Sequence, residues 1–120
     1  MSRIRYLLDE DVPRAIRDQL LRREPDLEVL AVGAETAPGF GTSDPQLLQW
    51  IEQEGYLLVS RNRRTLPRHL QEHLEAGGHV PGILLIRRRA ALQQLIDDLL
   101  LIWRAGHPEE YRDRLAYLPL

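Results

Sequence analysis

The chain carries four short runs in which nearly every residue is apolar or aromatic. Each run is followed by acidic residues, by glycine or by a stretch rich in arginine, which marks where it ends. Short runs that are apolar throughout are typical of strands buried on both faces of a parallel sheet. The sequence therefore predicts four buried strands, over residues 4–8, 27–32, 56–60 and 83–86.

The segments between these runs place apolar residues at helical spacing, with charged residues between them. The first predicted helix has Pro13 at its first position and Asp11 as its expected N-cap. The second is capped by Ser43 or Asp44, with Pro45 at an early position. The predicted helices cover residues 13–23, 45–54, 67–76 and 90–104, and a short helical tail is expected to follow.

Strands that alternate with helices predict an α/β fold built as one domain over residues 1–120. We expect a three-layer α/β/α sandwich around a parallel sheet of four strands or slightly more. In such sheets ligands bind beyond the carboxyl ends of the strands. The residues that directly follow the predicted strands are therefore the candidates for a functional site.

Three acidic residues, Asp9, Glu10 and Asp11, directly follow the first predicted strand. Adjacent like charges repel, so a divalent cation would explain the cluster; the alternative is that these acids cap the next helix and interact with its dipole. Asp44, at the start of the second helix, is expected at the same rim, although this is also ordinary helix-start chemistry. Glu35, in the loop between them, is a further candidate. The candidate metal ligands are Asp9, Asp11 and Asp44.

The third predicted strand ends in Ser60 and Asn62, which should lie beside these acids. The carbonyl oxygen of Asn62 can coordinate a hard cation but brings no charge, so it makes a weaker site than aspartate. The candidate catalytic residues are Asp9, Asp44 and Asn62. The alternative is that this stretch is a solvated turn.

Arginines surround the predicted acidic centre. Arg61, Arg63 and Arg64 follow the third strand, and Arg14 begins the first helix. Carboxylates that hold magnesium, surrounded by arginines that hold a phosphate backbone, suit a nuclease. The alternative is an arginine-rich surface with ion pairs to nearby acids. These four arginines are the candidate nucleic-acid-binding residues.

Composition narrows the classes of protein. The chain has no cysteine, which excludes a disulfide, a thiolate zinc site and an iron–sulfur cluster, and fits a reducing cytoplasm. All of its basic residues are arginine; this suits phosphate contacts, but GC-rich codon usage explains it equally well. A receiver domain that accepts a phosphoryl group needs a lysine to neutralise it, and the chain has no lysine, so this class is disfavoured. No apolar run approaches the roughly 20 residues that span a bilayer, so no membrane segment is expected.

Two further patterns carry expectations. His69 and His73 have the helical i,i+4 spacing of a metal pair, but the HExxH pattern is absent, so we interpret them as surface residues. The last predicted helix is apolar around residues 99–103, more than one sheet face needs, which predicts a homodimer.

Three stretches together resemble the PIN-like domains of an uncharacterised family related to VapC-type toxins. They are "RYLLDEDVPRAIRDQL", "SDPQLLQWIEQEGYLLVSRN" and "HVPGILLI", and the resemblance extends from about residue 4 to the last long helix. It implies that Asp9 matches the acid of the first strand and Asp44 the acid at the second helix. Asn62 and Arg64 stand where such domains usually carry acids, which departs from the pattern.

The resemblance implies a ribonuclease that hydrolyses the RNA backbone with Mg²⁺ or Mn²⁺, and that serves as the toxin of a pair with an antitoxin protein. The alternative, prompted by Asn62 and Arg64, is a catalytically impaired PIN-like module that binds RNA or a protein partner.

Overall fold

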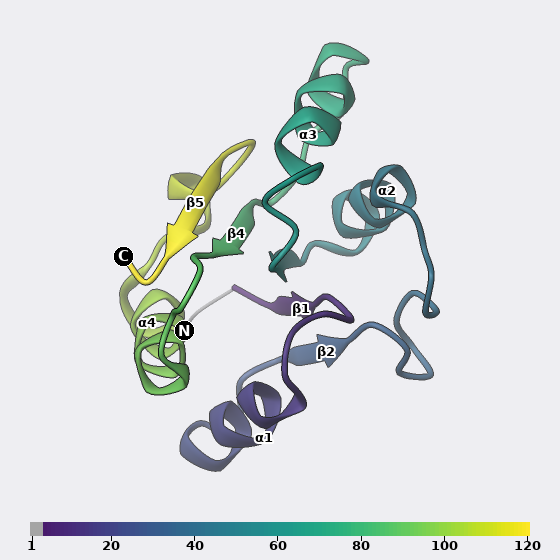
Figure 1. Ribbon diagram of the computed structural model, residues 1–120. Helices are drawn as coiled ribbons and strands as arrows, with labels where there is room; N and C mark the ends of the chain where they lie inside the picture. Colours follow the sequence, from purple (N-terminus) through teal and green to yellow (C-terminus); the bar gives the residue numbers. More distant parts are fainter. Residues whose placement is uncertain (1–3) are drawn as a thin grey trace.

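The predicted α/β fold is confirmed by a computed structural model, which describes residues 4–120. A single parallel sheet of five strands, in the order β2-β1-β3-β4-β5, runs through the middle of the domain (Figure 1). The strands are β1 (Tyr6–Leu8), β2 (Val29–Ala31), β3 (Leu57–Ser60), β4 (Ile83–Ile86) and β5 (Leu115–Leu118); the helices are α1 (Arg14–Arg23), α2 (Asp44–Glu54), α3 (Leu66–Glu75) and α4 (Leu92–Ala105).

Helices cover both faces of the sheet, as the continuous apolar strands predict. Side chains alternate along each strand, so that Tyr6 and Leu8 face one hydrophobic core and Leu7 faces the other. The first core packs against α1 and α4, and the second against α2 and α3. These are the three layers of the predicted sandwich (Figure 1).

The chain changes direction across the sheet between β1 and β3. The first crossover places β2 on one side of β1, and the later crossovers add β3, β4 and β5 on the other side. The carboxyl ends of β1 and β3 therefore meet at a topological switch point, where open α/β sheets bind ligands.

The last crossover differs from the other three in hand. The steps from β2 to β5 all move across the sheet in the same direction. The helices α2 and α3 lie on one face, but α4 lies on the opposite face beside α1. The β4-α4-β5 connection consequently has the opposite hand to the β3-α3-β4 connection, although such connections nearly always share one hand.

The predicted helical tail is wrong. After α4 the chain makes only a short 3₁₀ turn, Pro108–Glu110, and then forms β5, which pairs in parallel with β4. Along β5, Ala116 and Leu118 contact the core with α1 and α4, whereas Leu115 contacts the opposite core. This period of two marks a strand, but three such residues in four are too short a signal to recognise in the sequence.

The prediction that Asp11 caps the first helix is also wrong. The N-cap position belongs to Pro13, and no side chain caps α1. For α2 the structure resolves the two options: Ser43 is the N-cap, and its hydroxyl accepts a hydrogen bond from the Gln46 N–H at 3.4 Å. Asp44 is therefore the first residue of α2, with its carboxylate available for other partners.

The apolar surplus that motivated a homodimer is mostly buried within the chain. Leu99, Leu100 and Ile102 belong to the core, and Trp103 packs against it, while Leu101 is exposed. The homodimer stays a prediction, without this support. Among residues 4–120, no helix combines the length and apolar character needed to cross a membrane.

Candidate functional site

Asp9 directly follows β1, and its backbone N–H and its carboxylate together form three hydrogen bonds. Its backbone N–H donates to the carbonyl of Val59 at 2.8 Å, which continues the pairing of β1 with β3. Its Oδ1 accepts from the Glu10 N–H at 2.8 Å, and its Oδ2 accepts from the Ser60 hydroxyl at 2.7 Å. The carboxylate is therefore fixed in direction at the rim of the sheet.

Ser60 connects the two halves of the site. It is the last residue of β3, and within the described residues it is the one polar residue counted as fully buried. Its hydroxyl donates to Asp9 and accepts from the Asn62 N–H at 3.0 Å. A buried hydroxyl that is satisfied in both directions gives the rim a fixed geometry.

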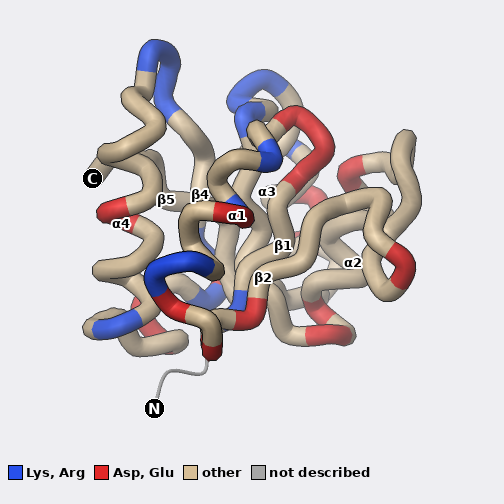
Figure 2. The backbone as a smooth tube through the Cα atoms, turned by 90° about the horizontal axis from the view of Figure 1, so that it is seen from below, with Lys and Arg blue, Asp and Glu red and all other residues tan. Residues whose placement is uncertain are grey.

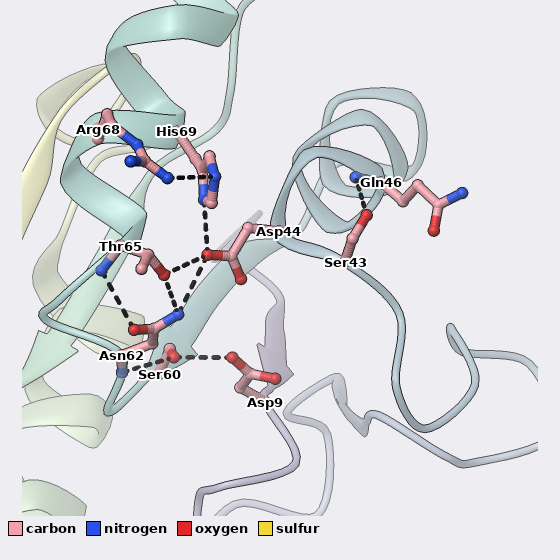
Figure 3. A network of polar contacts seen from close by, with 9 residues as sticks. All are labelled: Asp9, Ser43, Asp44, Gln46, Ser60, Asn62, Thr65, Arg68 and His69. Atoms are coloured by element: carbon pink, nitrogen blue, oxygen red, sulfur yellow. Dashed lines mark hydrogen bonds and ion pairs between the residues drawn. The ribbon is translucent and has the colours of Figure 1, made fainter.

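Asp44 receives three donors on a single oxygen. Its Oδ2 accepts from Asn62 Nδ2 at 3.1 Å, from the Thr65 hydroxyl at 2.7 Å and from His69 Nδ1 at 2.8 Å. No hydrogen bond to its Oδ1 is found within the described part of the chain. In Figure 3 this second oxygen points down toward the side of the site on which Asp9 lies.

A continuous chain of hydrogen bonds thus joins the two acids that the sequence analysis singled out. It runs from Asp9 through Ser60 and Asn62 to Asp44, and it links β1, β3 and the start of α2 (Figure 3). The order of the strands brings Asp44 and Asn62 beside Asp9, although they lie 35 and 53 positions after it in the chain.

Burial is the main reason that the pKa of Asp9 is raised above its ordinary value of 3.8. The hydrogen bonds from Ser60 and Glu10 lower it, and the negative charges of Asp11 and Asp44 raise it again. Within residues 4–120 no arginine or histidine forms an ion pair with Asp9. A cation between Asp9 and Asp44 would relieve this repulsion.

The donor set fits a divalent cation only in part. Asp9 and Asp44 can offer carboxylate oxygens, but in residues 4–120 no group of three or more acids, histidines or cysteines is placed to share a metal. The amide oxygen of Asn62 is turned away from the acids, because it accepts from the Thr65 N–H at 3.3 Å. Two carboxylates, completed by water, make a weaker site than three.

The neighbouring acids are engaged elsewhere. Asp11 is exposed and accepts a hydrogen bond from the Arg61 N–H at 3.2 Å. Glu10 is also exposed, and it accepts from the Gly41 N–H at 3.1 Å. Both hydrogen bonds hold neighbouring loops at the rim, and the role of Asp11 as a metal ligand stays a prediction.

The four candidate arginines differ in their freedom. Arg63 is partly buried and donates to the carbonyl of Ile86, which ties the end of β3 to the end of β4. Arg14, Arg61 and Arg64 are exposed, and their guanidinium groups have no partner within the described residues. Figure 2 shows basic segments at the same end of the molecule as the acidic stretch after β1.

His69 is a site residue that sequence reasoning missed. Since a carboxylate only accepts, Nδ1 of His69 carries the proton it shares with Asp44, and Nε2 lies 3.3 Å from a guanidinium nitrogen of Arg68. The signal was available: α3 starts at the same rim, so residues in its first turn face the site. Thr65 and His69 lie four apart, on one side of that turn.

Comparison with models of known protein families, with curated proteins and with solved structures gives no match. The resemblance to PIN-like domains therefore stays a prediction that rests on the quoted residues.

His73 belongs to a second polar cluster, which lies near the amino ends of the strands. Its Nε2 is 2.6 Å from Glu52 Oε1, which also accepts from the His79 N–H at 3.0 Å. The ring of His79 in turn contacts Asp113 at 2.8 Å. The cluster connects α2, α3, the loop before β4 and the loop before β5, so it is structural.

This cluster predicts a loss of stability in acid. Hydrogen bonds from the His79 N–H and from His73 lower the pKa of Glu52 below 4.5. Burial alone would raise the pKa of Asp113, but hydrogen bonds from His79 and Val80 hold it below 3.8. A lowered folded-state pKa means that the stabilisation is present above the unfolded value and is lost as the pH falls through the folded one.

The free energy of unfolding should therefore decrease as the pH is lowered below about 4.5, as urea titrations at successive pH values can measure. The double variant Glu52→Gln with Asp113→Asn should show a shallower decrease. An unchanged slope would contradict this account of the cluster.

Proposed function

We propose that this chain is a PIN-like ribonuclease that depends on Mg²⁺ or Mn²⁺, and that Asp9 and Asp44 hold the cation. The observation that carries the proposal is the hydrogen-bonded bridge from Asp9 through Ser60 and Asn62 to Asp44 at the switch point of the sheet. Two acids from distant parts of the chain are held at the same rim, one of them with a raised pKa and no cationic partner among the described residues.

The roles of the residues follow from their contacts. A bound Mg²⁺ or Mn²⁺ would supply an activated water and neutralise charge on the phosphate. Ser60 orients Asp9, while Thr65 and His69 orient Asp44. A carboxylate that is already oriented loses little freedom when it binds a cation, which favours a site of only two acids.

The exposed arginines suit the backbone phosphates of an RNA substrate. Arg61 and Arg64 follow β3, beside Asn62, and Arg14 begins α1 next to the acidic stretch. Their free guanidinium groups can bind backbone phosphates. The protein is thereby suited to a polyanion, even though its formal net charge is −2.

A second candidate function is supported by a specific observation. Asn62 donates to Asp44 where a third carboxylate would face the cation, and Arg64 stands where the resemblance expects a fourth acid. This arrangement favours a catalytically impaired module that binds RNA or a protein partner such as an antitoxin. The two candidates share the binding surface and differ in whether the RNA backbone is broken.

The first candidate predicts cation-dependent cleavage. A labelled single-stranded RNA should be cut by the wild-type protein in Mn²⁺ or Mg²⁺ and remain intact in EDTA. Asp44→Asn should slow cleavage at least about tenfold, which corresponds to about 1.4 kcal/mol of lost cation binding in the transition state. Asp26→Asn, an exposed acid in the turn before β2, is the matched control and should cleave normally.

Two results would contradict the ribonuclease. One is cleavage that proceeds equally in EDTA, which would indicate a contaminating enzyme or cation-free chemistry. The other is the absence of cleavage in either metal while the RNA is bound, which is the expected result for the impaired module.

A further inference from the structure

A cavity of about 440 Å³ lies between the carboxyl ends of β1 and β2 and the first turns of α1. Its volume is within the range of small-molecule sites. Leu8, the residue directly before Asp9, contributes to its wall, so the cavity adjoins the end of the strand that Asp9 follows. The lining is apolar at the strand ends and charged along the helix: Leu8, Ala31 and Val32 on one side, Arg14, Arg17 and Asp18 on the other.

Phe40, the only phenylalanine in the chain, is 65% exposed in the loop after β2. Its ring rests on Gly33, which lines the cavity: a Cβ at Gly33 would collide with the tip of the ring. Gly33 also has φ +97°, a conformation that suits glycine. The Phe40 ring therefore packs on one residue of the cavity wall and keeps much of its surface in solvent.

The loop that carries Phe40 is fixed to the acid site. The Gly33 N–H donates to the carbonyl of Pro38 at 2.7 Å, which closes the loop on itself. The Gly41 N–H donates to Glu10 Oε2 at 3.1 Å, and Glu10 is adjacent to Asp9. The exposed ring of Phe40 is thus carried by a loop that is anchored to the residue next to Asp9. A ring that is already held in place loses less conformational entropy on binding than a mobile one.

The charges at the cavity suit a nucleotide. Arg14 is exposed and has no partner within the described residues, so it can bind a phosphate. Arg17 donates through Nε to the Val29 carbonyl at 3.3 Å, which leaves its terminal nitrogens available. Asp18 repels a phosphate but accepts hydrogen bonds from a base or a ribose hydroxyl.

We propose that Phe40 and this cavity form a base-stacking subsite for an unpaired nucleotide, so that the chain selects single-stranded RNA. The proposal rests on the proposed function, since it names the substrate class of that same site. A base stacks on the exposed ring of Phe40, and the adjoining backbone phosphate binds Arg14. Bases stacked inside a duplex cannot offer their faces to the ring, so the duplex should bind more weakly than the single strand.

The test measures binding in EDTA, where cleavage does not occur. A short oligouridine RNA that contains one 2-aminopurine reports stacking, because the fluorescence of this base is quenched when it stacks. Moving the 2-aminopurine along the oligomer locates the position that the protein quenches. Wild-type protein should quench one position and bind the single strand more tightly than the duplex.

Phe40→Ala should weaken binding about 5- to 100-fold and remove the quenching. Phe40→Leu, which keeps an apolar side chain but has no ring, should behave like the alanine variant. Gly33→Ala keeps the ring but displaces it, and should also lose the quenching. Leu101→Ala, a 55% exposed residue on α4, is the matched control and should bind like the wild type.

Arg14→Gln tests the phosphate contact separately. It should weaken binding without restoring the fluorescence, and should reduce the slope of log affinity against log salt by about 0.7. An oligomer that is abasic at the quenched position should bind wild type and Phe40→Ala equally.

Equal RNA binding by wild type and Phe40→Ala overturns the subsite, as does equal affinity for duplex and single strand, or no binding at all. None of these results decides whether the acid pair cleaves RNA with a cation, which the assay with Asp44→Asn measures separately. Loss of cation-dependent cleavage with intact Phe40-dependent quenching would in turn overturn only the catalytic proposal.

Discussion

Replacing Asn62 by aspartate together with Arg64 by aspartate should raise the affinity for Mn²⁺ by about 100-fold or more and should accelerate RNA cleavage. A carboxylate about 4 Å from a unit charge contributes about 4 kcal/mol at an effective dielectric constant near 20, and more against a divalent ion. The Nδ2 atom of Asn62 lies 3.1 Å from Oδ2 of Asp44, so a carboxylate at this position would add its negative charge directly beside that of Asp44.

The same change should destabilise the metal-free protein. Asn62 donates to Asp44, and aspartate would replace this hydrogen bond by repulsion between two carboxylates. We expect the free energy of unfolding to fall by about 1–4 kcal/mol without metal, and Mn²⁺ to restore it. Thermal unfolding with and without Mn²⁺ measures both effects in one experiment.

The single variant Asn62→Ala is the matched control, because it removes the hydrogen bond without adding charge. It should destabilise the protein as well, but Mn²⁺ should not restore it. If wild type already binds Mn²⁺ and cleaves RNA as well as the doubly restored protein, the reading of this chain as an impaired module fails. If the restored protein gains neither property, the cation site itself is refuted.

Asp9→Asn should strongly slow cation-dependent cleavage and leave the protein about as stable as the wild type, because the loss of a buried charge offsets the loss of one hydrogen bond. Loss of an interaction of about 4 kcal/mol with the cation corresponds to roughly a thousandfold in rate, so we expect a decrease of about 100-fold or more. The carbonyl oxygen of an asparagine can still accept from the Ser60 hydroxyl, so the bridge is retained, but its amide group cannot also accept from the Glu10 N–H.

The expected stability of the Asp9→Asn protein follows from the raised pKa of Asp9. When the folded-state pKa of an acid lies above its unfolded value, ionisation favours the unfolded state, and stability falls as the pH rises through that window. At neutral pH the ionised Asp9 therefore destabilises the fold, and a neutral asparagine removes this cost. Urea unfolding at pH 7 compares the two proteins, and Asp26→Asn again serves as control.

A marked loss of stability in Asp9→Asn would show that the carboxylate is needed to build the rim, and that its loss of cleavage reports unfolding. Retained cleavage in a stable Asp9→Asn protein would remove Asp9 from the site.

The sequence was sufficient for the layers of the fold and for the convergence of the acids. The strands at residues 6–8, 57–60 and 83–86 are apolar at every position except Ser60, and this is a strong signal for a central parallel strand. Because parallel strands present their carboxyl ends at one edge, the position of Asp9 after β1 and of Asn62 after β3 followed directly.

The rest depended on contacts that no local pattern encodes. Asp11 belongs to the same acidic stretch as Asp9, but its carboxylate accepts a hydrogen bond from the Arg61 N–H. His69 contacts Asp44 only because α2 and α3 pack side by side on one face. The side chain of Asn62 could have turned either its oxygen or its nitrogen toward the acids. The Thr65 N–H donates to the oxygen, so the nitrogen faces Asp44.

The opposite hand of the β4-α4-β5 connection decides how the four helices are divided between the two faces of the sheet. If the β4-α4-β5 connection had the same hand as the earlier ones, α4 would lie on the face that α2 and α3 cover. Then α1 alone would cover the opposite face of the five-stranded sheet. Its placement gives each side a pair of helices. A chain of 120 residues can thus enclose two hydrophobic interiors without any additional covering segment.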